Sequence, residues 1–174
     1  MIYFTADLHF YHGNVIKHAK RPFADAAEMN RALIRNWNQT VSTEDEVYIL
    51  GDVTMKGAGY AMEALTQLHG RKYLVKGNHD GFAEQASFDL SIFKWIKDYH
   101  ELKYQNELFM LFHYPIQEWN GLHRGAYHLH GHQHNHADYN EANRAQGLRC
   151  YDIGVDANRY LPVGIHDLMA YFEA

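Results

Sequence analysis

This chain contains five short polar motifs, and four of them directly follow an apolar run typical of a buried β-strand. The motifs are Asp7-Leu8-His9, Gly51-Asp52, Gly77-Asn78-His79-Asp80, Phe112-His113 and Gly131-His132-Gln133-His134. Side chains at the ends of successive strands can converge on one point in space. Asp, His and Asn are also side chains that bind divalent metals. The pattern therefore predicts a fold in which strand ends meet around a metal site.

The hydrophobic pattern predicts an α/β fold with a mixed sheet or two packed sheets. Strands are expected over residues 2–6, 47–50, 72–75, 99–104, 108–112, 126–130 and 148–153. Asp25 followed by Glu28 is typical of a capping box, and apolar residues at helical spacing follow from Met29 to Val41. Further helices are expected over 60–68 and 163–172. The alternation of strands and helices in the first half predicts parallel βαβ units, and residues 99–112 predict a hairpin.

Composition indicates one globular domain over residues 1–174, with 47% hydrophobic and 21% charged residues. The net charge of −5 does not favour nucleic acid or an anionic membrane as a partner. Bound cations would still make a site locally positive, so the net charge does not exclude phosphate substrates. The single cysteine, Cys150, allows no disulfide within the chain. With neither a signal peptide nor an apolar run near the ~18 residues of a membrane span, we expect a cytoplasmic protein.

Each motif alone has an ordinary structural explanation beside the functional one. Asp7 and His9 would share one face of a strand, but they also fit a turn with a surface histidine. Asp52 has two oxygens that could bridge metals, but Gly-Asp is also a common turn. His79 suits a proton donor near a metal centre, with Asp80 orienting its ring, or a turn histidine facing solvent. His113 fits a ligand and a core residue equally well.

The histidines near the end of the chain allow two interpretations. They are His123, His128, His130, His132, His134 and His136. They could form a loose metal-binding tract, or Gly131 could begin a sharp loop from which His132 and His134 enter one site. The second interpretation fits better, because Tyr127 and Leu129 are not typical of a disordered polar tract.

The five motifs in this order resemble the calcineurin-like metallophosphoesterase superfamily, with the resemblance running from Asp7 to His134. Residues 5–14 and 21–23 further resemble a subgroup of small prokaryotic and phage phosphoesterases. The resemblance implies a four-layer α-β-β-α sandwich of two β-sheets flanked by helices. It also implies one metal held by Asp7, His9 and His134, a second held by Asn78, His113 and His132, and Asp52 as the bridge between them.

The implied function is hydrolysis of a phosphate mono- or diester by a metal-bridging hydroxide, with His79 as general acid. Two divalent cations are expected, manganese first and iron, zinc, nickel or cobalt as alternatives. The substrate would be a small phosphate ester, contacted by Asn78, His12, Asn14, Arg21 and Arg124. Trp119, His123 and Tyr127 are also expected near the site. Many family members carry an Asp and an Arg shortly after Gly-Asp, and this chain has Val53-Thr54-Met55-Lys56 instead, which leaves Asp80 to orient His79.

Two other functions remain open at this point. A non-catalytic scaffold on the same fold would act through protein–protein contacts, although such relatives have lost ligands and this chain keeps them. A histidine-rich metal store would keep its metal content when Asp52 is removed. The sequence does not choose between mono- and diesters, and oligomeric state is not readable from it.

Overall fold

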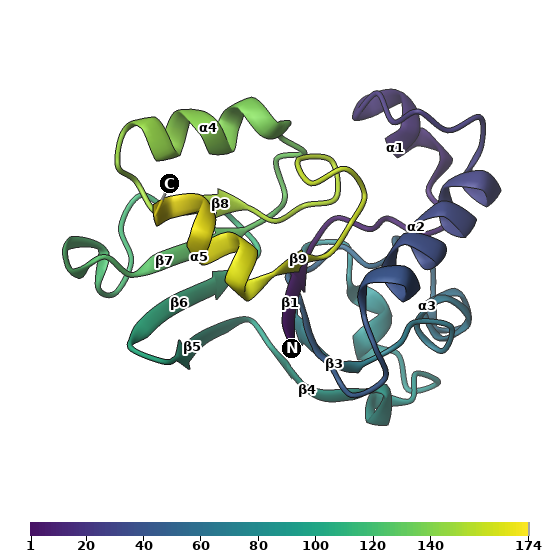
Figure 1. Cartoon of the computed structure of the whole chain (residues 1–174). Coiled ribbons are helices and arrows are strands. Elements are labelled where there is room, and N and C mark those ends of the chain that lie inside the picture. Colours follow the sequence, from purple (N-terminus) through teal and green to yellow (C-terminus); the bar gives the residue numbers. More distant parts are fainter. Residues whose placement is uncertain (174) are drawn as a thin grey trace.

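The computed structural model describes residues 1–173 and builds them around two β-sheets flanked by helices (Figure 1). The strands are β1 (Ile2–Thr5), β2 (Glu46–Ile49), β3 (Arg71–Val75), β4 (Phe93–Lys97), β5 (Tyr99–Tyr104), β6 (Glu107–Phe112), β7 (Tyr127–His130), β8 (Cys150–Asp152) and β9 (Val163–Gly164). The α-helices are α1 (Gly13–His18), α2 (Ala26–Thr40), α3 (Ala58–Leu65), α4 (Ala137–Ala145) and α5 (Ile165–Glu173). Short 3-10 helices are η1 (Gly81–Glu84), η2 (Leu90–Ile92) and η3 (Leu122–Arg124).

The first sheet has the strand order β4-β3-β2-β1-β9, and the second has the order β5-β6-β7-β8. Strands β1 to β4 pair in parallel, β9 runs antiparallel to β1, β5 and β6 form the expected antiparallel hairpin, and β6, β7 and β8 are parallel. The expectation of an α/β fold with two mixed sheets is confirmed.

Central strand β2 shows how the layers are held together. Val47 and Ile49 point into the hydrophobic core that includes residues of α2 and α3, whereas Tyr48 and Leu50 point into the core shared with the second sheet. Side chains alternate between the two faces of a strand, so this apolar run is buried on both sides. Packing on both faces fixes the position of β2 between the two layers. The position of Gly51, which follows this apolar run, is fixed with it.

Helix α2 begins where the capping residues predict. The Asp25 side chain accepts a hydrogen bond from the Glu28 backbone N–H, and Glu28 Oε2 accepts one from the Ala24 N–H. The buried face of the helix includes Met29 and Trp37. The cap satisfies N–H groups that would otherwise lack partners, and the apolar face packs the helix on the first sheet.

Four elements differ from the expected ones. Residues Val163 and Gly164 form β9 rather than the start of the last helix, because they pair with Phe4 and Tyr3 of β1. Helix α1 has six residues and no side-chain cap, and α4 has a single fully buried residue, Asn140, so neither has a clear apolar stripe. Strand β4 is a further difference from the expected elements, and it forms by pairing in parallel with β3.

The carboxyl ends of the parallel strands meet at one edge of the molecule. Ala6, just after β1, forms a parallel bridge with Gly154, just after β8, which joins the two sheets there. In α/β sheets this edge is the usual place for a ligand site. Among residues 1–173 no helix is long and apolar enough to cross a membrane.

Candidate metal centre

Two groups of metal-binding side chains lie at this edge. Asp7, His9 and His134 form the first candidate site, called the first metal site below, and Asp52, His113 and His132 form the second, called the second metal site. Within each group, one potential ligand atom per residue lies within 4.8 Å of the others. The Asn78 Oδ1 atom adds to the second metal site, 3.1 Å from His113 Nε2. The structure thus brings together all seven residues assigned to metal binding by the resemblance.

Asp52 lies between the two sites. Its Oδ2 atom is 3.4 Å from His9 Nε2, and its Oδ1 atom is 3.6 Å from His113 Nε2. One carboxylate oxygen therefore faces each site, which is the orientation that a bridging ligand needs.

The ligands sit on a strained backbone. Asp7, His9, Asp52, His132 and His134 have φ angles between 51° and 73°. This left-handed region is costly for residues other than glycine, and such strain concentrates at functional sites. Asp7 and His9 lie together as expected, but the expected reason, strand spacing, was wrong. Strand β1 ends at Thr5, and both residues lie in a loop. That loop is held by backbone hydrogen bonds to Gly51 and Asp52, of 3.0 and 2.9 Å.

Two glycines, one of them in the last motif, make room for the Asp7 carboxylate. A Cβ atom on Gly131 would lie 2.5 Å from Asp7 Oδ2, and one on Gly154 would lie 2.6 Å from the same atom. The backbone N–H of His132 donates to both Asp7 oxygens, at 3.1 and 2.9 Å. A side chain at either glycine would displace the carboxylate from this cradle.

The centre holds more buried negative than positive charge. Four buried carboxyl groups lie here, those of Asp7, Asp52, Asp152 and Asp156. Arg21 is the one buried arginine among residues 1–173. Burial, followed by the charges of Asp152 and Asp52, raises the pKa of Asp7 well above its usual value. Burial would also raise the pKa of Asp52, but the adjacent His9 and His113 rings lower it to about 2. Divalent cations would offset this excess of carboxylates.

Unused nitrogen atoms also fit metal binding. Both ring nitrogens of His9 are buried without a hydrogen-bond partner among the described residues. Burial lowers the pKa of His9 to about 4, so the ring is neutral and keeps a free lone pair at neutral pH. The Nδ1 atom of His113 lies 2.8 Å from the Leu50 carbonyl, which leaves Nε2 to face Asp52 and Asn78. The side chains present therefore fit two divalent cations.

A cavity of about 470 Å³ opens over both sites. Its lining includes four metal-site residues and four other polar residues. The metal-site residues are His9, Asp52, His132 and His134, and the others are His12, Asn14, His18 and His79. The His79 ring lies 5.5 Å from the His9 ring, centroid to centroid, and the His79 backbone N–H donates to Asp52 Oδ1 at 3.0 Å. His12, Asn14 and His79 are thus placed where a substrate would bind, and His18 is an addition that the sequence did not suggest.

The structure contradicts the substrate role expected for Arg21. Its side chain is 0% exposed and is ion-paired with Asp156, which lies 135 positions later in the chain. The expected role of Asp80 is also wrong, because its carboxylate accepts hydrogen bonds from the backbone N–H groups of Asp52, Val53 and Gly77 rather than from the His79 ring. Arg124 is a further correction: it lies on η3, bonds to Asn120 and does not line the cavity.

Other residues expected near the site lie in the hydrophobic interior or outside the cavity. Trp119 donates from Nε1 to the Ala126 carbonyl, and Tyr127 stacks on Phe109 with 4.6 Å between ring centroids. Both are buried by apolar packing. A sequence pattern alone does not distinguish such core aromatics from aromatics that line a site. His123 lies on η3 and does not line the cavity over the metal sites.

Two acidic residues of the centre were not identified from the sequence. Asp152 ends β8, accepts a hydrogen bond from the Gly154 N–H at 2.8 Å and adds to the negative charge near Asp7. Asp156 lies four residues further and bonds to His134 Nδ1 at 2.7 Å. A signal was present in the sequence, because Asp152 and Asp156 flank Gly154 at the end of an expected strand, as Asp52 lies beside Gly51.

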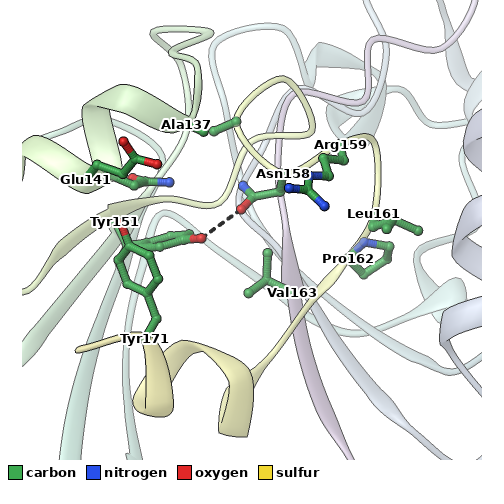
Figure 2. A pocket seen from close by; sticks show the side chains of 11 residues that line it. Ala137, Glu141, Tyr151, Asn158, Arg159, Leu161, Pro162, Val163 and Tyr171 are labelled. Carbon is green, nitrogen blue, oxygen red and sulfur yellow. Dashed lines mark hydrogen bonds between the residues drawn. The ribbon is translucent and has the colours of Figure 1, made fainter. Parts of the chain in front are cut away.

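A second cavity, of about 310 Å³, lies between α4, α5 and the loop after β8 (Figure 2). Figure 2 shows Arg159 and Asn158 on its wall, with a 3.0 Å hydrogen bond from the Tyr151 hydroxyl to Asn158 Oδ1. Neither candidate metal site contributes a residue to it. The Asp and His side chains that could hold metal ions therefore line the first cavity and not this one.

Comparisons with known proteins agree with this geometry. The model of the calcineurin-like phosphoesterase family matches residues 1–153. An uncharacterized protein of Methanocaldococcus jannaschii is 34% identical over 176 residues, covering 99% of this chain and 91% of that protein. The Gene 66 protein of Mycobacterium phage L5 is 35% identical over 82 residues, 45% of this chain and 39% of the phage protein.

A solved structure extends the match to the whole fold. A protein of unknown function from Aquifex aeolicus superimposes with a TM-score of 0.75 and 25% identity over 98% of both chains. The ordered motifs, the two-sheet fold and the family match lead to one conclusion: this chain belongs to the calcineurin-like phosphoesterase family.

Proposed function

We propose that this protein is a dinuclear metal-dependent phosphoesterase that hydrolyses a small phosphate mono- or diester. The single observation that carries the proposal is the position of Asp52, with one carboxylate oxygen toward His9 and the other toward His113. A carboxylate shared in this way suits two adjacent cations, as in the two-metal sites of phosphatases and nucleases.

Divalent cations held there would supply Lewis-acid polarisation of the phosphoryl oxygens and an activated water at neutral pH. The other roles belong to the chain. His79 lines the same cavity and would donate a proton to the leaving oxygen, while His12 and Asn14 would contact the phosphate from the α1 side. Carboxylate, imidazole and amide ligands accept several metals, so manganese is the first cation to test and iron, zinc, nickel and cobalt follow.

The test combines metal analysis with turnover. Purified protein is expected to bind two Mn²⁺ per chain and to hydrolyse bis-p-nitrophenyl phosphate. In Asp52→Asn, the loss of the shared negative charge should weaken binding at both sites and lower kcat by about 10²-fold or more. Full metal occupancy without turnover on any ester of a mono- and diester panel would favour the scaffold function. Unchanged metal content and rate in Asp52→Asn would show that the bridging assignment is wrong.

A further inference from the structure

A buried ion pair links the start of the chain to its last quarter behind the first metal site. Arg21 donates from Nε to Asp156 Oδ1 and from Nη2 to Asp156 Oδ2, both at 2.8 Å. Both side chains are 0% exposed. The planar guanidinium meets the carboxylate through two parallel hydrogen bonds, which fixes both groups in position. Asp156 lies beyond residues 1–153, the part of the chain that the family model matches.

The remaining Arg21 donors hold the loop that carries Asp7 and His9. Nη2 donates to the Asp7 carbonyl at 2.6 Å, and Nη1 donates to the Leu8 carbonyl at 3.0 Å. The backbone there is strained, with φ of 57° at Asp7 and 51° at His9. Arg21 thus stabilises a backbone conformation that would otherwise be unfavourable, and that conformation sets the position of two ligands of the first metal site.

Asp156 fixes the third ligand of the same site. Its Oδ2 atom lies 2.7 Å from His134 Nδ1. In the neutral ring, a proton on Nδ1 that is donated to this carboxylate leaves the lone pair of His134 Nε2 available to a cation. The Arg21 guanidinium holds the same carboxylate from the other side, so the position of Asp156 relative to the His134 ring is fixed.

The second metal site is supported by different groups. His113 is oriented by the Leu50 carbonyl, 2.8 Å from its Nδ1. The Asp52 loop is held by the Asp80 carboxylate, which accepts from the N–H groups of Asp52 and Val53 at 2.9 and 2.8 Å. Neither Arg21 nor Asp156 has a hydrogen bond to a residue of the second metal site among the contacts of residues 1–173.

We propose that Arg21 and Asp156 are positioning residues for the first metal site alone. Arg21 holds the Asp7–His9 backbone, Asp156 holds the His134 ring in the tautomer that leaves Nε2 free, and their mutual ion pair couples the two. This inference rests on the proposed function only in assuming that the two sites take up divalent cations.

The experiment measures the two sites separately by titrating the full-length, metal-free protein with Mn²⁺. Wild type should bind two ions. Asp156→Asn should bind one ion as wild type does and the other with affinity reduced about 10- to 100-fold, the usual effect of removing a group that orients a metal ligand. The electron paramagnetic resonance signal of a coupled manganese pair should be lost at Mn²⁺ concentrations that saturate wild type.

A matched control lies in the same loop. Asn158 donates from Nδ2 to the Asp152 and Gly154 carbonyls, and among residues 1–173 it has no hydrogen bond to Arg21 or His134. Asn158→Ala should loosen the loop and keep both Mn²⁺ affinities. Arg21→Lys keeps the charge but not the paired hydrogen bonds, so it should weaken the same site, and it replaces Asp156→Asn as the test if that variant does not fold. In a His134→Ala background, Asp156→Asn should have little further effect on affinity.

Two results would overturn the inference. One is equal weakening of both sites in Asp156→Asn or Arg21→Lys, which would indicate a general structural role. The other is wild-type affinity at both sites in these variants. Failure of the proposed function is distinguishable, because it would appear as a wild-type protein that binds no metal pair or hydrolyses no phosphate ester.

Discussion

Asp52 lies between the two metal sites with one carboxylate oxygen toward His9 and the other toward His113. Its neighbours are neutral histidines, and burial lowers the pKa of His9 to about 4. The sequence predicts a carboxylate at the end of a buried strand here, because Gly51-Asp52 follows the apolar residues of β2. Its two-sided environment is a property of the folded chain, since His9 and His113 come from other strand ends.

His79 is the residue whose chemistry is most directly testable. The His79→Ala variant should retain both metals, because the contact of this residue with Asp52 is made by its backbone N–H. Rates should fall by about 10² to 10⁴-fold for esters with poor leaving groups, which need a proton, and much less for p-nitrophenyl esters. Steady-state kinetics across leaving groups of graded pKa would measure this difference.

The control for that series is His123→Ala, which removes a histidine that does not line the metal cavity. It should leave all rates unchanged. A His79→Ala variant that loses the same factor for good and poor leaving groups would argue against a general-acid role.

At the scale of elements, α2 shows how far local sequence can specify structure. Its start at Asp25 and its buried face, including Met29 and Trp37, were predictable because a capping box and helical periodicity act over a few residues. Strand β9 was not predictable, because two residues take on strand structure only through pairing with β1. Helix α1 carries His12 at its N-cap and Asn14 in its first turn, yet no side chain caps it.

The cap of α2 gives a prediction at this scale. Replacing Asp25 by Ala leaves the Glu28 N–H without its acceptor and should lower the free energy of unfolding by about 1 kcal/mol. Urea denaturation at pH 7 would measure the change. Asp25→Asn keeps an acceptor oxygen and should stay within a few tenths of a kcal/mol of wild type, roughly as for other cap replacements. Equal destabilisation by both variants would contradict the capping role.

For the whole molecule, buried histidines link stability to pH. Burial lowers the pKa of His128 and of His130 to about 4, below the ~6.5 of an unfolded chain. His128 accepts from the Ile116 N–H, and His130 bonds to Tyr139 at 3.1 Å, so both are neutral core residues. Between pH 6.5 and 4 the unfolded chain binds more protons at these positions. Their contribution to stability is therefore present above pH 6.5 and lost as the pH falls through this range.

The measurement compares the pH dependence of unfolding in wild type and in His128→Gln. Each histidine contributes up to about 3 kcal/mol across this window, so the variant should lose stability less steeply as the pH falls. The comparison is needed because burial raises the pKa of Asp80 to about 7 and that of Asp152 above its usual value, and these carboxyls give the metal-free protein the opposite slope. Parallel curves for the two proteins would contradict the assignment.

The sequence by itself determined the order of the motifs, the apolar strands that precede them, the α2 cap and the residue types of the metal ligands. These depend on interactions within a few positions, or on chemistry that a residue carries wherever it lies. Tertiary structure alone decided that Arg21 pairs with Asp156 instead of meeting substrate, that Asp80 supports loops instead of the His79 ring, and that Trp119 packs in the core. The reason is physical: burial and pairing over as many as 135 positions set those roles, and a buried charge takes the partner that the packed fold brings to it.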